Sequence, residues 1–109
     1  MNDSLKIEYR FWISCNNQPL FGKGKINLLL KIKETGSLRK AAEELKMSYR
    51  KAYYGIDQMN KIASEPIVIM KRGGKSGGNS EITDYGNKLI IAFQKLEKEF
   101  AEFASKKTI

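Results

Sequence analysis

Two pairs of basic residues stand where they could bind a chain of phosphates. Each pair closely follows a serine of the kind that caps helices: Ser37 with Arg39 and Lys40, and Ser48 with Arg50 and Lys51. Each pair therefore falls in the first turn of a predicted helix, where the helix dipole disfavours cations by about 0.3–1 kcal/mol per site. A polyanion lying across both helix starts would reverse this penalty, because backbone N–H groups and cations would converge on its phosphates. The alternative interpretation is that these four basic side chains are solvated surface charges that bind nothing.

The second predicted helix, residues 48–63, carries side chains suited to contacting bases. With Ala52, Ile56 and Met59 facing inward, the opposite side presents Arg50, Tyr54 and Asp57, flanked by Tyr49, Lys51 and Tyr53. An arginine can form two hydrogen bonds with a guanine edge, and a tyrosine can contact a phosphate or pack on a thymine methyl. We predict that this helix reads the major groove of DNA. Tyr49 and Tyr53 fit either a DNA contact or the rim of the core.

A basic, glycine-rich segment over residues 71–80 offers a second contact with the DNA backbone or minor groove. Residues 73–76 look like part of the phosphate loop of nucleotide hydrolases, but Ile69 stands where that motif needs its first glycine. Glycines let a backbone approach phosphates closely, and the basic side chains supply charge. The alternative is a merely flexible loop. The predicted DNA-binding residues of this segment are Arg72, Gly74, Lys75 and Ser76.

The spacing of apolar residues predicts the elements that position these groups. Two stripes of helical period, separated by a short turn, form the pattern of a helix-turn-helix. A strand, the glycine-rich segment and a returning strand form a β-hairpin, or wing. The predicted elements are a helix that follows Gly22-Lys23-Gly24 and ends at Thr35-Gly36, the helix-turn-helix over residues 37–63, the wing over residues 67–83 with strands at 67–70 and 81–83, and a long helix over residues 84–104.

Residues 5–14 alternate between apolar and polar side chains, which predicts a strand with one buried face. Trp12 falls on the polar side, where it would cover a neighbouring element or join a subunit contact. Residues 16–19, Asn-Asn-Gln-Pro, predict a turn.

The long helix carries large apolar residues at the spacing of a coiled-coil seam: Leu89, Phe93, Leu96, Phe100 and Phe103. About two heptads are too few to be stable alone, and the helix could also pack along its own domain. Since so small a domain has little core to spare for so wide a stripe, we favour a homodimer. A two-fold dimer would present two reading helices to half-sites about one DNA turn, or a multiple of it, apart.

Size and charge fit a single nucleic-acid-binding domain. The 109 residues carry a net charge of +8, and residues 22–75 hold 13 Lys and Arg against 5 Asp and Glu, so the whole excess lies there. The single cysteine, Cys15, suits a reducing compartment, and no apolar run approaches the roughly 18 residues of a membrane span. We therefore expect a cytoplasmic protein with no membrane partner. With no histidine and no carboxylate cluster, an enzyme is the least expected class.

The order of elements and several short motifs resemble the N-terminal DNA-binding domain of the molybdate-responsive regulator (ModE) family, which is itself similar to LysR-type winged helices. The resemblance covers nearly the whole chain. The family typically has tryptophan where Tyr53 stands and glycine where Ser76 stands, departures that could alter base preference or wing flexibility without changing the fold. The motifs are TGS at 35–37, MSYR at 47–50, IDQMN at 56–60, and GGKSGG at 73–78 followed by Ile82-Thr83.

The resemblance implies a dimeric transcriptional regulator that binds double-stranded DNA. In molybdate-responsive members a separate C-terminal module binds the oxyanion, whereas this chain stops at Ile109. We therefore expect no cofactor in this chain, and molybdate sensing is doubtful because the oxyanion-binding module is absent.

Residues 1–109 are thus predicted to form one mainly α domain with a small β-hairpin (α+β), a winged helix-turn-helix with an N-terminal strand and a long C-terminal dimerisation helix. The leading hypothesis is a sequence-specific regulator. One alternative is a non-specific architectural nucleic-acid binder, whose binding would survive loss of Arg50. The other is a winged-helix module for protein contacts, which would bind no duplex.

Overall fold

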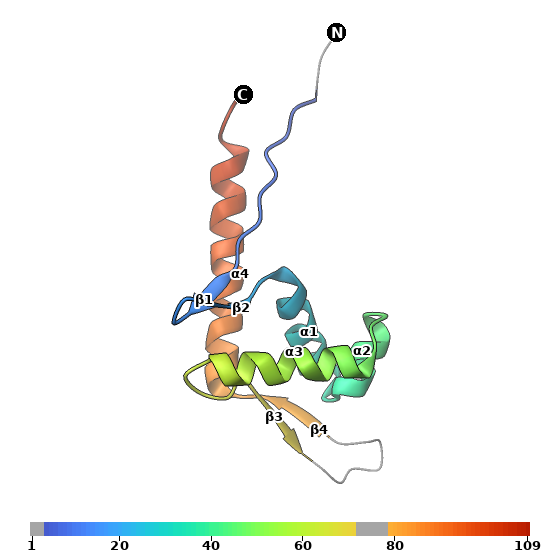
Figure 1. The fold of residues 1–109 in the computed structure, drawn as a ribbon. Helices are drawn as coiled ribbons and strands as arrows, with labels where there is room; N and C mark the ends of the chain where they lie inside the picture. Colours follow the sequence, from blue (N-terminus) through green and yellow to red (C-terminus); the bar gives the residue numbers. More distant parts are fainter. Residues whose placement is uncertain (1–3, 72–78) are drawn as a thin grey trace.

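The computed structural model describes residues 4–71 and 79–109 and has a mixed α and β fold (Figure 1). Within these residues there are four helices and two small antiparallel sheets. The molecule measures 60 × 32 × 19 Å, and the C-terminal half of α4 extends away from the other helices (Figure 1). The elements are β1 (Ile13–Cys15), β2 (Gln18–Phe21), α1 (Lys23–Thr35), α2 (Leu38–Glu44), α3 (Tyr49–Ile62), β3 (Val68–Lys71), β4 (Asn79–Ile82) and α4 (Asp84–Ser105).

Helix α1 is the centre of the hydrophobic core. Its residues Ile26, Leu29 and Ile32 are completely buried, and burying a side chain of this size contributes about 1.5–3 kcal/mol. Small residues lie where α2 and α3 approach the core, since Ala41 and Ala52 are also completely buried. The core therefore fixes α3 with one face inward and the other exposed.

The two predicted helix starts are present. Helix α1 is terminated by Gly36, whose left-handed backbone (φ 69°) favours glycine. Ser37 caps α2 and Ser48 caps α3. The turn between these two helices also contains a left-handed residue, Lys46 (φ 56°), so this turn is made without a glycine.

The predicted N-terminal strand over residues 5–14 is wrong for most of its length. Only Ile13–Cys15 belongs to a strand, and residues 4–12, here called the N-terminal arm, have no regular secondary structure. The ring of Phe11 stacks on Phe93 of α4 at 4.6 Å, and Tyr9 lies edge-on to Phe100 at 6.1 Å. The alternation belongs to an extended segment beside a helix, in which Phe11 is partly buried whereas Leu5, Ile7 and Tyr9 remain exposed.

The predicted turn over residues 16–19 is too long. Asn16 and Asn17 make the turn with positive φ angles of 50° and 64°, and Gln18 already begins β2. Pro19 lies within this strand, which is compatible with its lack of an N–H because β2 is an edge strand of a two-stranded sheet. Strand β2 was not predicted.

The second hairpin, β3–β4, pairs Val68 with Ile82 and Lys71 with Asn79. Strand β3 begins one residue later than predicted, and β4 begins two residues earlier. Residues 72–78 lie outside the described residues, so the predicted contacts at Arg72, Gly74, Lys75 and Ser76 fall there.

Helix α4 has 22 residues and is therefore about 33 Å long. Its first half packs on the core through Ile90 and Phe93, and its second half has the N-terminal arm alongside (Figure 1). No helix in the two described ranges combines the length and apolarity that crossing a membrane requires.

Candidate nucleic-acid interface

The starts of α2 and α3 combine capped N-termini with cations. The Ser37 hydroxyl accepts a hydrogen bond from the Lys40 N–H at 3.2 Å, and the Ser48 hydroxyl accepts one from the Lys51 N–H at 3.1 Å. Neither helix has an acidic residue in its first turn. Free N–H groups and basic side chains at a helix start suit a phosphate or another tetrahedral oxyanion.

Arg39 connects the two helix starts. Its guanidinium lies over the ring of Tyr49 at 4.6 Å, and Tyr49 in turn is 6.2 Å from the ring of Tyr53. A cation over an aromatic face is attracted by the ring quadrupole, by about 0.5–1 kcal/mol at an exposed site. The contact therefore holds a cation of α2 beside the exposed face of α3.

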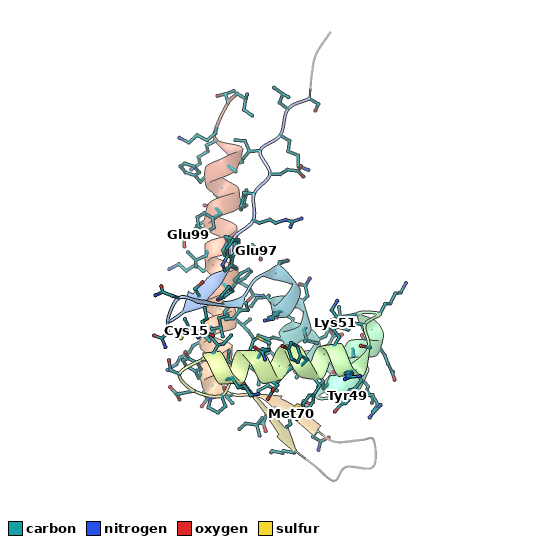
Figure 2. All side chains as sticks on the ribbon, in the orientation of Figure 1. Cys15, Tyr49, Lys51, Met70, Glu97 and Glu99 are labelled. Atoms are coloured by element: carbon teal, nitrogen blue, oxygen red, sulfur yellow. The ribbon has the colours of Figure 1, made fainter. Side chains whose placement is uncertain are left out.

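The three tyrosines of α3 are accessible. The exposed fractions of Tyr49, Tyr53 and Tyr54 are 37%, 48% and 63%. None of them belongs to the hydrophobic core, so the core-rim interpretation of Tyr49 and Tyr53 is not supported. Figure 2 shows Tyr49 and Lys51 towards the end of α3 that lies near α2.

The outer face of α3 forms a shallow hollow of about 470 Å³. The lining residues are Ser48, Arg50, Lys51, Tyr53, Tyr54 and Asp57. Asp57 is the acidic member, and its carboxylate forms an ion pair with Lys61 at 2.9 Å, which raises the pKa of Lys61. Because Lys61 offsets this negative charge, the face remains open to an anionic partner.

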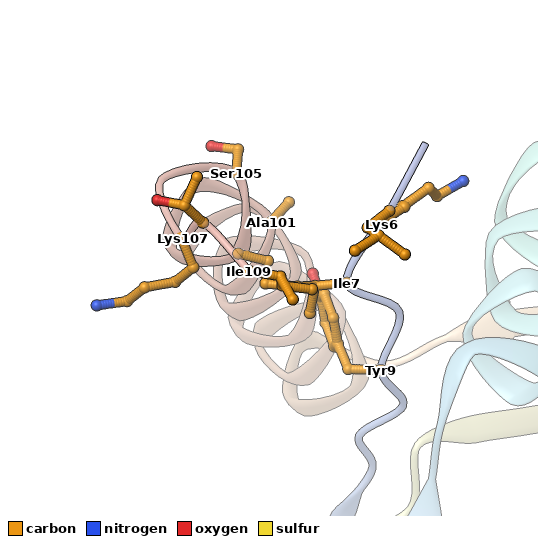
Figure 3. Close-up of a pocket in the computed structure, with 10 residues that line it drawn as sticks. Lys6, Ile7, Tyr9, Ala101, Ser105, Lys107 and Ile109 are labelled. Atoms are coloured by element: carbon orange, nitrogen blue, oxygen red, sulfur yellow. The ribbon is translucent and has the colours of Figure 1, made fainter. Parts of the chain in front are cut away.

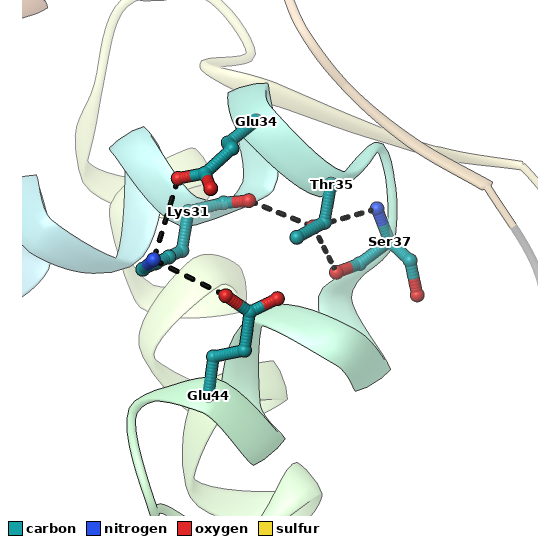
Figure 4. A network of polar contacts seen from close by, with 5 residues as sticks. All are labelled: Lys31, Glu34, Thr35, Ser37 and Glu44. Carbon is teal, nitrogen blue, oxygen red and sulfur yellow. Dashed lines mark hydrogen bonds and ion pairs between the residues drawn. The ribbon is translucent and has the colours of Figure 1, made fainter.

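A polar network that sequence reasoning missed joins α1 to α2 (Figure 4). The Lys31 ammonium contacts Glu44 at 3.2 Å and Glu34 at 3.3 Å, and these carboxylates raise the pKa of Lys31. The Thr35 hydroxyl donates to the Lys31 carbonyl at 2.7 Å and accepts from the Ser37 N–H at 3.3 Å. Together these contacts fix the cap residue of α2.

Two side chains attach the β3–β4 hairpin to the helices. Ser80 is buried, and its hydroxyl accepts from the Leu38 N–H at 3.1 Å, which satisfies a free donor at the start of α2. The Asn60 amide oxygen accepts from the Ile67 N–H at 2.8 Å, and its NH₂ donates to the Val68 carbonyl at 2.9 Å. Neither role was predicted. An asparagine shortly before a helix-breaking proline was the available signal for Asn60, and Ser80 offered none.

The predicted dimer seam divides into two parts. Phe93 is only 1% exposed, because it packs against Phe11 and Phe21, so it belongs to the core of its own domain. Leu89 is partly buried against the same core. The remaining three members are exposed by 38%, 41% and 63%: Leu96, Phe100 and Phe103.

Towards the C-terminal end of α4, an open groove of about 590 Å³ lies between this helix and the N-terminal arm (Figure 3). Ile7 and Tyr9 line it from the arm, and Ala101 and Ile109 line it from the α4 side. This groove has both apolar and polar walls, because it is also lined by Lys6, Ser105, Lys107 and Thr108.

No protein-family model matches the chain. The chain is 40% identical to the molybdenum transport protein ModE of Azotobacter vinelandii over 76 residues, which are 70% of this chain and 28% of that protein. It is 38% identical to the molybdenum-pterin-binding protein MopB of Rhodobacter capsulatus over 84 residues, 77% of this chain and 31% of MopB. The DNA-binding transcriptional dual regulator ModE of Escherichia coli K12 is 35% identical over 80 residues, 72% of this chain and 30% of that protein.

The chain therefore spans less than a third of the length of these relatives. The match confirms the resemblance to ModE proteins and makes the chain a homologue of part of a set of transcriptional regulators and molybdenum-binding proteins. None of these names denotes an enzyme, which agrees with the expectation of a non-enzymatic chain.

The prediction about cofactors is wrong. It held that this chain has none and that molybdate sensing is doubtful because the oxyanion-binding module is absent. The relatives named for molybdenum binding or transport match 70–77% of this chain itself. The prediction compared the end of this chain at Ile109 with the separate C-terminal module of the family and took the difference as the absence of a molybdate site, an inference that the matches to molybdenum-binding relatives overturn.

Proposed function

We propose that the chain is a winged helix-turn-helix that binds double-stranded DNA sequence-specifically as a transcriptional regulator. The observation that carries the proposal is the pair of capped helix starts with Arg39 and Lys40 on one and Arg50 and Lys51 on the other. An arrangement selected for stability alone would place acids there. Phosphates turn the same arrangement into an attraction.

The outer face of α3 supplies the means of reading bases. Arg50 and Tyr54 are exposed on the side opposite the buried Ala52 and Ile56, where a helix in a major groove presents its contacts. The relative from Escherichia coli K12 is itself named a DNA-binding regulator. Ser37 was predicted to contact DNA, but it is only 5% exposed and its hydroxyl caps α2. Phosphate contacts at Lys40 and Ser48 would therefore set the register of α3 on the duplex.

The β3–β4 hairpin acts as the wing in this proposal. Ser80 and Asn60 fasten its two strands to the start of α2 and to α3, so the described part of the hairpin has a fixed place beside the reading helix. The glycines and basic residues of the tip, Arg72, Gly74, Lys75 and Ser76, suit a phosphate backbone or a minor groove.

The regulator works as a homodimer in the cytoplasm in this proposal, with the exposed part of the α4 seam and the N-terminal arm as its contact. Leu96, Phe100 and Phe103 are available on one chain, and apolar area of this kind is normally covered by a partner. Two-fold symmetry would place two α3 helices about 34–36 Å apart, one turn of DNA, or at a multiple of that distance.

The test is selection of bound duplexes from a random DNA library at near-physiological salt, followed by binding measurements on the recovered site. We expect an inverted repeat. Replacing Arg50→Ala should relax the preference for the recovered site over scrambled DNA by about 1–3 kcal/mol. Lys40→Ala is the matched control. It should weaken binding to both duplexes alike and reduce the slope of log K against log salt concentration by about one.

The other results would each contradict the proposal. Bound DNA without an enriched sequence would indicate an architectural binder, and equal losses on both duplexes for Arg50→Ala would remove α3 as the reading helix. Failure to recover any duplex would indicate a protein-binding module. Repeating the selection with molybdate present checks whether that anion competes at the helix starts, which suit either oxyanion.

A further inference from the structure

A groove of about 520 Å³ lies on the flank of α3 that faces α1. It is distinct from the wing side, because Asn60, which contacts β3, projects from the opposite flank of the helix. Its volume falls within the range of ligand pockets. The lining residues are Gly24, Lys25, Asn27, Leu28, Leu45, Met47, Lys51, Tyr54, Gly55 and Gln58.

The groove is kept open by a glycine in the middle of a helix. A Cβ at Gly55 would meet only Leu28 Cδ2, at 4.0 Å, which is an ordinary contact. Alanine would therefore fit at position 55. It would also stabilise the helix by about 0.5–1 kcal/mol relative to glycine. Within residues 4–71 and 79–109, neither packing nor backbone angle requires this glycine, whereas a larger side chain would fill the groove.

The chemistry of the walls is apolar with a positive rim. Leu45 and Met47 are only partly buried and expose apolar surface there, with Leu28 beneath. Lys25 and Lys51 are the charged lining residues, and within the described ranges neither forms an ion pair. Among the residues that the structure describes, no carboxylate lines the groove.

We propose that this groove docks a short segment of another protein in which one or two apolar side chains are flanked by aspartate or glutamate. The apolar side chains would pack over Gly55 between Leu45 and Met47, and the carboxylates would pair with Lys25 and Lys51. A DNA backbone would match the lysines but would cover the apolar floor with polar groups, so charge and apolarity together favour the peptide.

A segment docked in this groove would interfere with DNA binding. Lys51 and Tyr54 line both this groove and the hollow on the outer face of α3, so a docked segment and a duplex would compete. The competition rests on the proposed DNA binding; the docking does not.

The probes are three fluorescein-labelled twelve-residue peptides, titrated against the full chain by fluorescence anisotropy. The first mixes leucine and phenylalanine with aspartate and glutamate, the second replaces its acids by asparagine and glutamine, and the third replaces its apolar residues by serine. We expect a Kd below about 100 μM for the first and at least roughly tenfold weaker binding for the other two.

Matched variants locate the site. Gly55→Leu, which fills the groove, should abolish binding of the first peptide, whereas Gly55→Ala should retain it and raise the stability of the chain. Lys51→Gln should weaken binding several-fold. Circular dichroism establishes that each variant is folded, and the weaker binding in Lys51→Gln still locates the site if Gly55→Leu is not folded.

Equal binding of the three peptides, binding that survives Gly55→Leu in a folded chain, or no binding at about 1 mM would overturn the proposal. Loss of duplex binding in Gly55→Leu without peptide binding to the wild-type chain would also overturn it and assign the groove to DNA. Peptide binding by a chain that binds no duplex would leave the docking intact and contradict the proposed function instead.

Discussion

Helices α3 and α4 both expose aromatic side chains, but the two surfaces differ in chemistry. On α3 the exposed rings are tyrosines that stand among cations, and Tyr49 lies under Arg39. On the second half of α4 the exposed rings are Phe100 and Phe103, which have no hydroxyl, and Lys107 lies over the Phe103 ring at 4.6 Å. The difference between the two surfaces therefore lies in the hydroxyls of the rings rather than in the presence of a cation. Rings with hydroxyls and neighbouring cations suit a polyanion, and rings without polar atoms suit an apolar partner.

The two surfaces also differ in how they are supported. Helix α3 is fixed by a completely buried stripe, a serine cap and the Asn60 contacts with β3. The second half of α4 packs against the N-terminal arm through Tyr9 and Phe11, and the Lys23–Glu97 ion pair at 2.6 Å joins it to the start of α1. A reading helix needs a rigid support to keep its register, whereas an association surface can be completed by the partner.

The largest expected effect on stability is that of replacing Phe93, which belongs to the core, unlike the exposed residues further along α4. Phe93→Ala should lower the free energy of unfolding by about 3–5 kcal/mol, because it removes a ring buried between Phe11 and Phe21. Phe103→Ala, ten residues further along, should leave the stability of the monomer nearly unchanged and weaken self-association. Urea denaturation and sedimentation velocity measure the two effects. Equal stability losses would contradict the division of the seam, and unchanged association of Phe103→Ala would remove it from the dimer contact.

A smaller effect is expected at the joint between α4 and the β3–β4 hairpin. A Cβ at Gly86 would lie 2.5 Å from the Ile67 carbonyl oxygen and 2.9 Å from Ile82 Cγ2. Gly86→Ala should therefore destabilise the chain by about 1–3 kcal/mol, since the backbone must move. Gly24→Ala is the control, because nothing lies within 4 Å of its Cβ. Thermal unfolding compares the two variants. Equal midpoints would contradict the prediction, because they would show that the chain accommodates the added methyl group at no cost.

The smallest effect concerns the Lys31 network behind α2. Its carboxylate partners Glu44 and Glu34 raise the pKa of Lys31 above the ordinary 10.5. The stabilisation is therefore complete below pH 10.5 and is lost as the pH rises through the higher pKa of the folded chain. Lys31 is partly accessible to solvent, which screens its ion pairs, so the difference in midpoint between wild type and Lys31→Met should be small and constant from about pH 7 to 9. A difference that already disappears in that interval would contradict the assigned network.

Patterns that depend on neighbouring residues were predictable. The apolar stripes of α2 and α3 and the caps Ser37 and Ser48 follow from local spacing, and the structure contains each. The exposure of Tyr54 follows from the same helical period. These features were accessible because a helix fixes the direction of each side chain within a few residues.

Contacts between distant segments were not predictable. The alternation of residues 5–14 is the same for a strand and for an extended arm on a helix, and only the position of α4 distinguishes them. Ser80 and Leu38 are 42 positions apart. Phe93 matched the seam spacing as well as Phe103 did, and the core decided between them.

The sequence by itself determined where the helices of the interface begin, which face of α3 carries charge, and that the excess positive charge lies within residues 22–75. The tertiary structure alone decided that the arm packs on α4, that Ser80 and Asn60 hold the hairpin, and that Gly55 leaves a groove open beside α3. The reason is physical. Caps and periodicity act over a few bonds of one chain, whereas packing depends on which surfaces the completed fold brings together.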